Sequence, residues 1–334
     1  IRSFTFKGFH KTEEEIIHLF YYKFQTVPLL ARMDAVMEYL IDEYETLRGK
    51  NISEEDMEAL RETFQKMYVT TDLYEIYGWL LKDCGYPELS NAEYERRKLE
   101  YEDVFPMLYL KYRLKGKNEH RNIKHLVIDE MQDYSYLQYV ILHTLFSCRM
   151  TILGDKAQTL DETMRDVLLF LPKIFGKKMR TIVLNKSYRN TVEIATYAGA
   201  INQTTDLELL DRHGKAVEEV YFSEEESMLK AIGENLSVGE NGYETAAVIA
   251  MTEEKARELY ELLKRRGIQA SYIDRDTSVF ERGLTVTTFY LAKGLEFDQV
   301  FGVFEEEENP LMTQAKYICA TRALHELYMY TVSL

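Results

Sequence analysis

From residue 123 onward, short β-rich runs alternate with amphipathic stretches of helical length. The first set contains "KHLVIDE", "YLQYVILHTLF", "RMTILGD", "TMRDVLLFLPKIF" and "RTIVLN". A second set contains "VEIATYAGAIN", "EEVYFS", "EESMLKAIGENL", "TAAVIAM", "EKARELYELLKRRG", "QASYID" and "LTVTTF". Such alternation is typical of parallel strands joined by crossover helices, so the sequence predicts the α/β fold class.

The residues before this alternation have a different pattern. Up to about residue 120, apolar residues recur at helical spacing, as in "PLLARMDAVMEYLIDEYETLRG". Ser53 is the expected N-cap of one helix, and another helix is expected from Thr71 or Asp72 to Gly85. We therefore predict three regions, with the two α/β domains joined near residues 176–180. They are a mostly helical segment (1–120) attached to or inserted in a first α/β domain, the rest of that domain (121–178) and a second domain (179–334).

The composition restricts the class of protein and of partner. A hydrophobic content of 46% argues against a disordered chain. With a net charge of -15, any contact with nucleic acid has to use local basic patches, and a protein partner fits the charge at least as well. The 3 cysteines form no paired pattern, and no long apolar run or signal peptide is present. We expect a cytoplasmic protein with no membrane segment, and an acidic loop at "FEEEENP" (304–310).

The string "VIDEMQDYS" (127–135) crowds acidic residues behind an apolar run. Ligands collect where the strands of a parallel sheet end, and Asp129 and Glu130 would point to opposite sides of an extended chain. One carboxylate can then face a metal ion while the other addresses a water molecule. The alternative is purely structural, because Asp133 and Ser135 are also suited to cap the following helix.

Two further strings place polar residues after apolar runs. In "TILGDKAQTL" (151–160), Gln158 carries an amide that can donate and accept hydrogen bonds at once, which suits sensing a phosphate or orienting water. In "VLNKSYRNT" (183–191), Arg189 offers a planar fork for phosphate oxygens and Tyr188 offers a stacking face. Taken alone, the second string is more typical of an exposed basic turn than of a binding site.

The last two strings lie near the C-terminus. In "TVTTFYLAKGLEFDQVFGV" (285–303), Gly294 permits a tight turn or a close backbone approach, and Glu296 can accept hydrogen bonds from a ribose. In "KYICATRALHELYMYTV" (316–332), Thr321 and Arg322 fall in an expected helix that leads into the last strand. A lone arginine there would ordinarily be a surface residue.

In their order along the chain, these strings resemble the motor core of superfamily 1 helicases of the UvrD, Rep and PcrA type. "VIDEMQD" is similar to motif II, "LGDKAQ" to motif III, "LNKSYRN" to motif IV, "TVTTFYLAKGLEF" to motif V and "YICATRALHEL" to motif VI. "YLKYRLKG", and Tyr290 in motif V, resemble the HelD branch, whose members associate with RNA polymerase. The 95 positions from Asn190 to Thr285 are too few for the inserted 2B domain of UvrD and Rep.

This resemblance implies two RecA-like domains of the P-loop NTPase type, the first of them incomplete in this chain. ATP would bind between them, with Asp129 holding Mg²⁺ and Glu130 acting as the general base. Gln158 would report the γ-phosphate to the nucleic-acid groove.

The second domain would contribute the remaining nucleotide contacts. The resemblance implies that Arg189 and Arg322 neutralise charge on the transferred phosphoryl group. Tyr188 would stack on the adenine, Gly294 would allow a close backbone approach and Glu296 would hold the ribose.

One departure from the family concerns the P-loop, GxxxxGK[ST], which cradles the phosphates. The sequence has no such string: its Gly-Lys pairs begin at Gly49, Gly116, Gly176 and Gly214 and are followed by Asn, Asn, Lys and Ala. We expect a fragment whose missing N-terminal part carries the P-loop, and negligible ATPase activity from this chain alone. A degenerate homologue that does not hydrolyse ATP is the alternative.

The functional hypothesis from the resemblance is the C-terminal part of an ATP-dependent helicase or translocase that acts on single-stranded or duplex DNA. The alternative is a HelD-like factor that binds RNA polymerase and uses ATP to remodel or recycle it. A third hypothesis is an α/β scaffold whose motif-like strings arose by accident.

Overall fold

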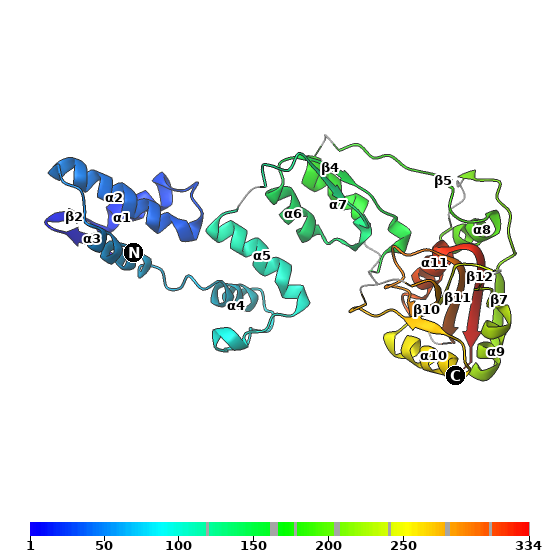
Figure 1. Ribbon diagram of the computed structural model, residues 1–334. Coiled ribbons are helices and arrows are strands. Elements are labelled where there is room, and N and C mark those ends of the chain that lie inside the picture. The colour runs from blue at the N-terminus through cyan, green and yellow to red at the C-terminus, as the bar shows by residue number, and fades with distance from the viewer. Residues whose placement is uncertain are drawn as a thin grey trace. The chain divides into compact units, whose positions relative to one another are not determined.

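The computed structural model describes residues 1–117, 120–160, 166–176, 179–203, 208–239, 242–277, 281–306 and 309–333 (Figure 1). The chain divides into two compact units. Unit 1 comprises Ile1–Val127 and Ser135–Thr151, and unit 2 comprises Ile128–Tyr134 and Ile152–Leu334. The two units are defined by compactness and do not test the three regions expected at 1–120, 121–178 and 179–334. The expected division into three regions therefore remains a prediction.

The N-terminal part of unit 1 is mostly helical, as its apolar spacing indicates. A short antiparallel hairpin comes first, and five helices follow: β1 (Phe4–Phe6), β2 (Phe9–Lys11), α1 (Glu13–His18), α2 (Arg32–Arg48), α3 (Glu54–Gln65), α4 (Leu73–Asp83) and α5 (Tyr101–Lys115). The hairpin was not predicted. Its tight turn consists of Lys7 and Gly8, both with positive φ, which matches the twist of hairpin strands.

The expected helix caps in this part are confirmed. The Ser53 hydroxyl accepts a hydrogen bond from the Asp56 N–H at the start of α3. The Asp72 side chain caps α4, and Gly85 follows that helix with a left-handed φ of 77°. Both termini are therefore set by local side-chain and backbone preferences, which is why the sequence alone predicted them.

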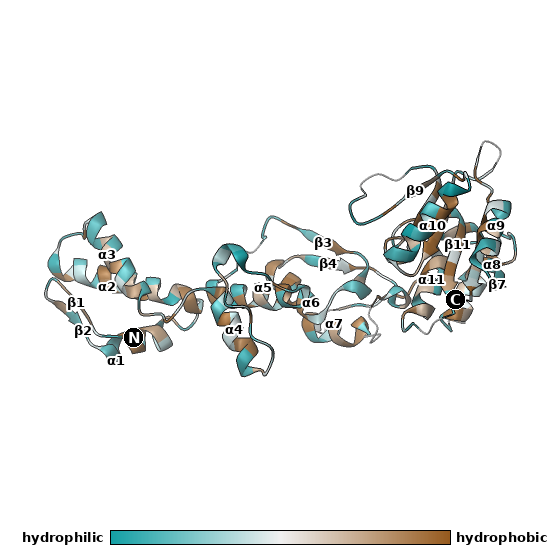
Figure 2. Cartoon of the chain, turned by 90° about the horizontal axis from the view of Figure 1, so that it is seen from below, coloured by the Kyte–Doolittle hydropathy of each residue, from teal (hydrophilic) through white to brown (hydrophobic). Residues whose placement is uncertain are grey.

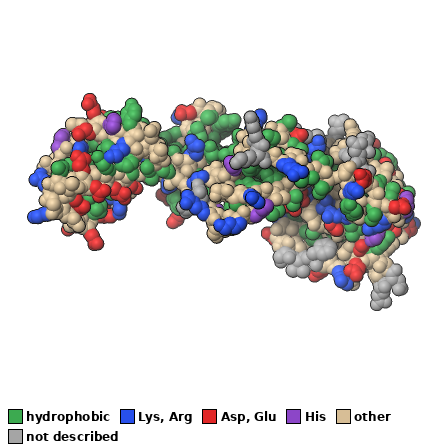
Figure 3. Space-filling model, turned by 90° about the horizontal axis from the view of Figure 1, so that it is seen from above, with side chains coloured by type: hydrophobic (Ala, Val, Ile, Leu, Met, Phe, Trp, Pro, Cys, Tyr) green, Lys and Arg blue, Asp and Glu red, His purple; other side chains and the backbone are tan. Residues whose placement is uncertain are grey.

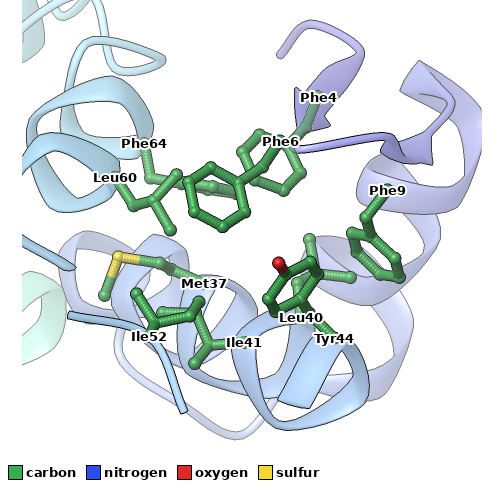
Figure 4. Close-up of a pocket in the computed structure, with 10 residues that line it drawn as sticks. All are labelled: Phe4, Phe6, Phe9, Met37, Leu40, Ile41, Tyr44, Ile52, Leu60 and Phe64. Atoms are coloured by element: carbon green, nitrogen blue, oxygen red, sulfur yellow. The ribbon is translucent and has the colours of Figure 1, made fainter. Parts of the chain in front are cut away.

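Hairpin, α2 and α3 enclose an apolar core. Figure 4 shows their side chains converging on a small apolar pocket. The Phe4 and Phe64 rings lie 4.9 Å apart between centroids. The full lining comprises Phe4, Phe6, Phe9, Met37, Leu40, Ile41, Tyr44, Ile52, Leu60 and Phe64. Because nearly all of these side chains are apolar, the pocket belongs to the packing of this part.

The second part of unit 1 leads into the first polar string. Strands β3 (His125–Ile128) and β4 (Arg149–Ile152) form a two-stranded sheet, and α6 (Tyr136–Leu145) lies between them in sequence. Both strands end at the border with unit 2. The polar residues that follow each strand therefore lie in unit 2.

A six-stranded parallel sheet forms the centre of unit 2. Its spatial order is β7-β12-β11-β8-β10-β9. The strands are β7 (Glu218–Phe222), β8 (Thr245–Ala250), β9 (Ala270–Tyr272), β10 (Gly283–Thr288), β11 (Phe297–Glu305) and β12 (Ala323–Val332). This sheet confirms the α/β fold class, and it is the kind of sheet expected for a RecA-like domain.

Helices cover both faces of the sheet. On one face, α8 (Val192–Ile201) and α11 (Met312–Arg322) pack in one apolar cluster with the strands. On the other face, α9 (Glu225–Asn235) and α10 (Glu253–Arg265) form a second cluster. Figure 2 shows hydrophobic residues on the strands and hydrophilic residues on outer helix surfaces. The central strand β8 is buried along nearly its whole length, as expected for a parallel strand covered on both faces.

Unit 2 also contains α7 (Val167–Phe175), β5 (Lys186–Ser187), β6 (Glu208–Leu209) and two short 3-10 helices, Met131–Asp133 and Lys156–Gln158. The strand expected at 180–185 was wrong, because the strand there covers only Lys186–Ser187. Ile182, Val183 and Leu184 are exposed and form no ladder. Their composition favours a strand, but a strand exists only where a neighbour completes its hydrogen bonds.

Some predicted features extend beyond the described residues. Residues 163–165 of the expected helix, and residues 177–178 of the expected domain joint, lie outside them. In the acidic loop expected at 304–310, Phe304 and Glu305 instead belong to β11, and residues 307–308 lie outside the described part. No helix in the described ranges has the length and apolar character needed to cross a bilayer.

Candidate functional site

The first candidate residues form a strained turn directly after β3. Glu130 adopts the left-handed conformation (φ 50°, ψ 51°), which is uncommon for residues other than glycine. The Glu130 N–H donates to the carboxylate of Asp129 over 2.8 Å. Asp129 is exposed and Glu130 is half-buried. Such strain persists where the surroundings impose it, and it often accompanies function.

Helix capping, the structural alternative for Asp133 and Ser135, applies to only one of these two residues. Ser135 caps α6 in a capping box with Gln138. Asp133 does not cap the helix; its carboxylate lies 2.6 Å from the Lys293 ammonium group. The acidic residues before α6 therefore belong to a polar network within unit 2.

Gln132 connects the two loops that follow β3 and β4. Its side chain is buried, and its Nε2 donates to the Glu130 carboxylate over 2.6 Å. Its Oε1 accepts from the backbone N–H of Asp155 at 3.1 Å. Gln132 thereby holds Glu130 in place, a role that was missed in the sequence although its amide stood between acidic residues.

Gly154 allows these two loops to approach closely. The Met131 N–H donates to the carbonyl of Leu153 over 2.8 Å. A Cβ at position 154 would lie 2.5 Å from Gln132 Oε1 and 2.6 Å from the Met131 backbone nitrogen. Any side chain at this position would push the loops apart.

Asp155 and Gln158 join the second loop to α11. The Asp155 carboxylate accepts hydrogen bonds from Gln158 Nε2 at 3.1 Å and from the Tyr317 hydroxyl at 2.8 Å. Burial, with the nearby Asp155 charge, raises the pKa of Tyr317, so its hydroxyl remains a donor at neutral pH. Tyr317 was not predicted as a site residue.

Lys293 is the cation on which three parts of the network converge. Its ammonium group lies 2.6 Å from Asp133 and 3.9 Å from the Glu130 carboxylate. It also donates to the backbone carbonyl of Gln158 over 2.8 Å. Only 8% of the Lys293 side chain is exposed. Its neighbour Gly294 has φ +79°, as expected for a tight turn.

Arg322 is a buried cation with an unsatisfied donor. The residue is 3% exposed and donates to Gln158 Oε1 at 3.0 Å and to the Leu295 carbonyl at 3.2 Å. Its buried Nε has no hydrogen-bond partner among the described residues. A buried guanidinium group with a free N–H is suited to an anionic ligand.

Other charges surround Arg322. Burial lowers its pKa and Arg189 lowers it further, whereas the carboxylates of Glu130 and Glu296 raise it. Arg189 pairs with Glu296 over 2.7 Å, and both side chains remain about half exposed. Tyr188 is 65% exposed, which leaves its ring accessible for stacking.

Asn190 anchors the turn that carries Tyr188 and Arg189. Its Nδ2 donates to the Ala323 carbonyl over 2.6 Å, at the end of α11. Asn190 therefore fixes the turn beside the helix that carries Arg322. Arg189 was predicted as a site residue at this turn, whereas Asn190 beside it was not.

The residues present fit magnesium and ATP in part. In the described part of the chain, no group of three or more His, Cys, Asp or Glu side chains forms a metal cluster. Mg²⁺ bound with a nucleotide needs only one or two carboxylates beside water and phosphate oxygens, and Asp129 can supply one. The free Nε of Arg322 fits a phosphate oxygen. The phosphate cradle itself has no counterpart in the sequence.

Comparisons with known proteins return solved structures alone. No family model and no curated protein matches the chain. The C-terminal domain of a possible DNA helicase from Lactobacillus plantarum WCFS1 is 25% identical, with a TM-score of 0.33, over 44% of this chain and 88% of that one.

Two viral proteins are also similar. Arterivirus nonstructural protein 10 (helicase), in complex with DNA, is 17% identical with a TM-score of 0.36, over 62% of this chain and 39% of that one. The PRRSV helicase is 17% identical with a TM-score of 0.35, and this chain covers 35% of its length. Because each TM-score is below 0.5, the function of this chain has to be argued from its own residues.

Proposed function

We propose that this chain belongs to an ATP-dependent helicase or translocase of superfamily 1 that couples nucleotide hydrolysis to movement on nucleic acid. The observation that carries the proposal is a set of side-chain contacts that join four of the expected motifs. Lys293 contacts Asp133 and the Gln158 backbone, while Gln158 contacts Arg322. Residues far apart in sequence are thus joined into one polar network containing carboxylates, amides and cations.

The proposed chemistry assigns one task to each side chain. Glu130, held by Gln132, takes a proton from the attacking water as general base. Asp129 holds Mg²⁺, which would neutralise phosphate charge when bound. Arg189 and Arg322 stabilise charge on the phosphoryl group.

The remaining residues would bind and sense the nucleotide. Tyr188 stacks on the adenine and Glu296 accepts from the ribose once its pair with Arg189 opens. Gln158 lies between Arg322 and Asp155, so a shift of Arg322 toward a phosphate changes the hydrogen bonds of the loop after β4.

The experiment is titration of the chain with a fluorescent ATP analogue and Mg²⁺, compared with the corresponding AMP analogue. We expect weak binding that requires the triphosphate, and an affinity loss of about tenfold in Arg322→Met, because one charged contact is worth about 1.4 kcal/mol or more. Lys264→Ala removes an exposed charge elsewhere and serves as the control. Equal binding of both analogues, or an unchanged affinity in Arg322→Met, would contradict the proposal.

Turnover is measured in the same preparation. We expect negligible ATP hydrolysis by this chain, since its sequence contains no GxxxxGK[ST] string. Hydrolysis at an ordinary helicase rate that disappears in Glu130→Gln would show that a separate phosphate cradle is unnecessary.

The alternative proposal is a HelD-like factor that binds RNA polymerase. It is favoured by the net charge of -15, and by the 95 positions from Asn190 to Thr285, which are too few for the inserted 2B domain of UvrD and Rep. Co-purification with RNA polymerase, compared with retention on single-stranded DNA at moderate salt, separates the two proposals. Retention on DNA without polymerase association would exclude the alternative.

A further inference from the structure

A chain of hydrogen bonds leaves α11 at one residue and returns to the same helix at another. The Tyr317 hydroxyl donates to Oδ2 of Asp155 over 2.8 Å. The same oxygen accepts from Nε2 of Gln158 at 3.1 Å. Oε1 of Gln158 in turn accepts from Nη2 of Arg322 at 3.0 Å. The loop after β4 is therefore fastened to α11 at both ends of the chain of bonds, and Gln158 lies between an acceptor and a donor.

The two neighbours of Gln158 determine which way its amide group faces. A carboxylate accepts hydrogen bonds and a guanidinium group donates them, whereas an amide has a donor end and an acceptor end of nearly equal shape. With Nε2 toward Asp155 and Oε1 toward Arg322, both contacts are favourable. The reversed amide would place oxygen against the carboxylate and N–H groups against the guanidinium. Asp155 therefore selects the orientation that makes Gln158 an acceptor for Arg322.

Asp155 is itself held by donors on both of its carboxylate oxygens. Its Oδ1 accepts from the backbone N–H of Ala157 at 3.0 Å, at the start of the short helix Lys156–Gln158. Its Oδ2 accepts from Tyr317 as well as from Gln158. Burial raises the pKa of Tyr317, so its hydroxyl keeps the proton that it donates at neutral pH. Tyr317 thus supports the carboxylate oxygen that faces Gln158.

Gln158 is one of the groups that fix the guanidinium of Arg322. Figure 3 shows acidic and basic side chains mixed on the outer surface, where water can stabilise each charge. Arg322 is 3% exposed, so its orientation depends on acceptors of the protein. Nη1 donates to the Leu295 carbonyl over 3.2 Å, and Nη2 donates to Gln158 and to the Thr321 hydroxyl. These contacts leave the buried Nε–H without a partner among the described residues.

We propose that Asp155 and Tyr317 are positioning residues for Arg322. They act through the Gln158 amide and hold the guanidinium so that its free Nε–H can donate to a phosphate oxygen. This role rests on the proposed function, in which Arg322 stabilises charge on the phosphoryl group, and neither residue needs to touch the nucleotide. If the contacts only fastened the loop to α11, their removal would lower stability without changing the surroundings of the Arg322 Nε–H.

The test is heteronuclear NMR spectroscopy of the arginine Nε–H groups in the whole chain, without nucleotide. The Arg322 resonance is assigned by its absence in Arg322→Lys. Asp155→Asn keeps the shape of the side chain but makes one end a donor, so the Arg322 resonance should shift. Its hydrogen exchange should become about tenfold faster, as expected for the loss of one hydrogen bond to a charged group. Tyr317→Phe should accelerate exchange by about threefold, because the Ala157 N–H still holds the carboxylate.

The matched control is Tyr197→Phe. The Tyr197 hydroxyl also donates to a carboxylate, that of Glu219, in unit 2 but outside the chain of hydrogen bonds to Arg322. Its loss should lower the urea midpoint of unfolding about as much as Tyr317→Phe does, and it should leave the Arg322 resonance unchanged. Equal changes of that resonance in both variants would overturn the positioning role.

A double variant tests whether Asp155 acts through the amide. In Gln158→Met the connection to Arg322 is already broken, so adding Asp155→Asn should have no further effect on exchange of the Arg322 Nε–H. An undiminished effect of Asp155→Asn in that background would overturn the role of Gln158 as the intermediate.

Nucleotide binding separates the positioning role from the proposed function. Asp155→Asn should bind the fluorescent ATP analogue about threefold more weakly, a smaller loss than in Arg322→Met, because the charge remains and only its orientation changes. A shifted Arg322 resonance with no binding of the analogue by any form of the chain would support the positioning of Arg322 and contradict the proposed function. An unchanged resonance in Asp155→Asn would overturn the positioning role even where the analogue binds.

Discussion

Cations have opposite environments in the two units. In unit 2, Lys293 and Arg322 are buried, and fixed partners hold them. In unit 1, Lys111, Arg113 and Lys115 are exposed without an acidic partner in the described chain. A buried cation needs hydrogen-bond acceptors at fixed positions and therefore fixes the arrangement of the loops around it. An exposed cation instead contributes to the electrostatic potential outside the protein. The same residue types therefore hold loops together in unit 2 and remain exposed to solvent in unit 1.

The largest expected effect comes from the glycine that lets the polar network close. Gly154→Ala should lower the free energy of unfolding by about 2 kcal/mol, because the new Cβ would overlap Gln132 and the Met131 backbone. Gly78→Ala is the control: it lies within α4 with open space around it and should stabilise by about 0.5 kcal/mol. Urea denaturation measures both, and equal effects would show that the close approach is unimportant.

Removing a buried cation that has a carboxylate partner should be the next largest effect. Lys293→Met should lower the free energy of unfolding by about 1–2 kcal/mol, less than for a fully buried pair because Asp133 is 32% exposed. In Lys293→Met/Asp133→Asn, the loss should be smaller than the sum of the single losses. Strict additivity would mean that the two side chains do not interact in solution.

Removing Arg322, the buried cation with an unsatisfied donor, should stabilise the fold instead of destabilising it. Arg322→Met should raise the free energy of unfolding by about 1 kcal/mol, because burial of the guanidinium is only partly compensated. Arg189→Met, at a half-exposed pair with Glu296, should change it by at most about 0.5 kcal/mol. A marked destabilisation in Arg322→Met would show that its hydrogen bonds outweigh its desolvation.

The smallest effect concerns an exposed pair. The hydrogen bond from His213 lowers the pKa of Glu193 to about 2, and Glu193 raises the pKa of His213 above its ordinary value of 6.5. A raised His pKa adds stability that is present below pH ~6.5 and is lost as the pH rises through the folded pKa. An NMR titration should show the raised value, and Glu193→Gln should return it toward 6.5. An unchanged titration in that variant would exclude the pair.

Several features were predictable because they depend on nearby residues. The alternation of strands and helices, the cap at Ser53 and the helix that carries Arg322 follow from local patterns. The prediction of a strand at 180–185 was wrong because a local apolar pattern does not show whether a neighbouring strand is present to complete the hydrogen bonds. Roles for the expected site residues remain proposals, although Glu130, Gln158 and Arg322 do lie in one network.

The sequence by itself determined the fold class and the order of the polar strings, because hydrophobic period and capping act over a few residues. The tertiary structure alone decided which side chains meet. Gln132, Lys293 and Tyr317 connect segments more than a hundred positions apart or in separate loops, and nothing in a local pattern specifies such partners. The segment after β10 places Lys293 beside the first string, where its ammonium group lies nearer to Asp133 than to Glu130.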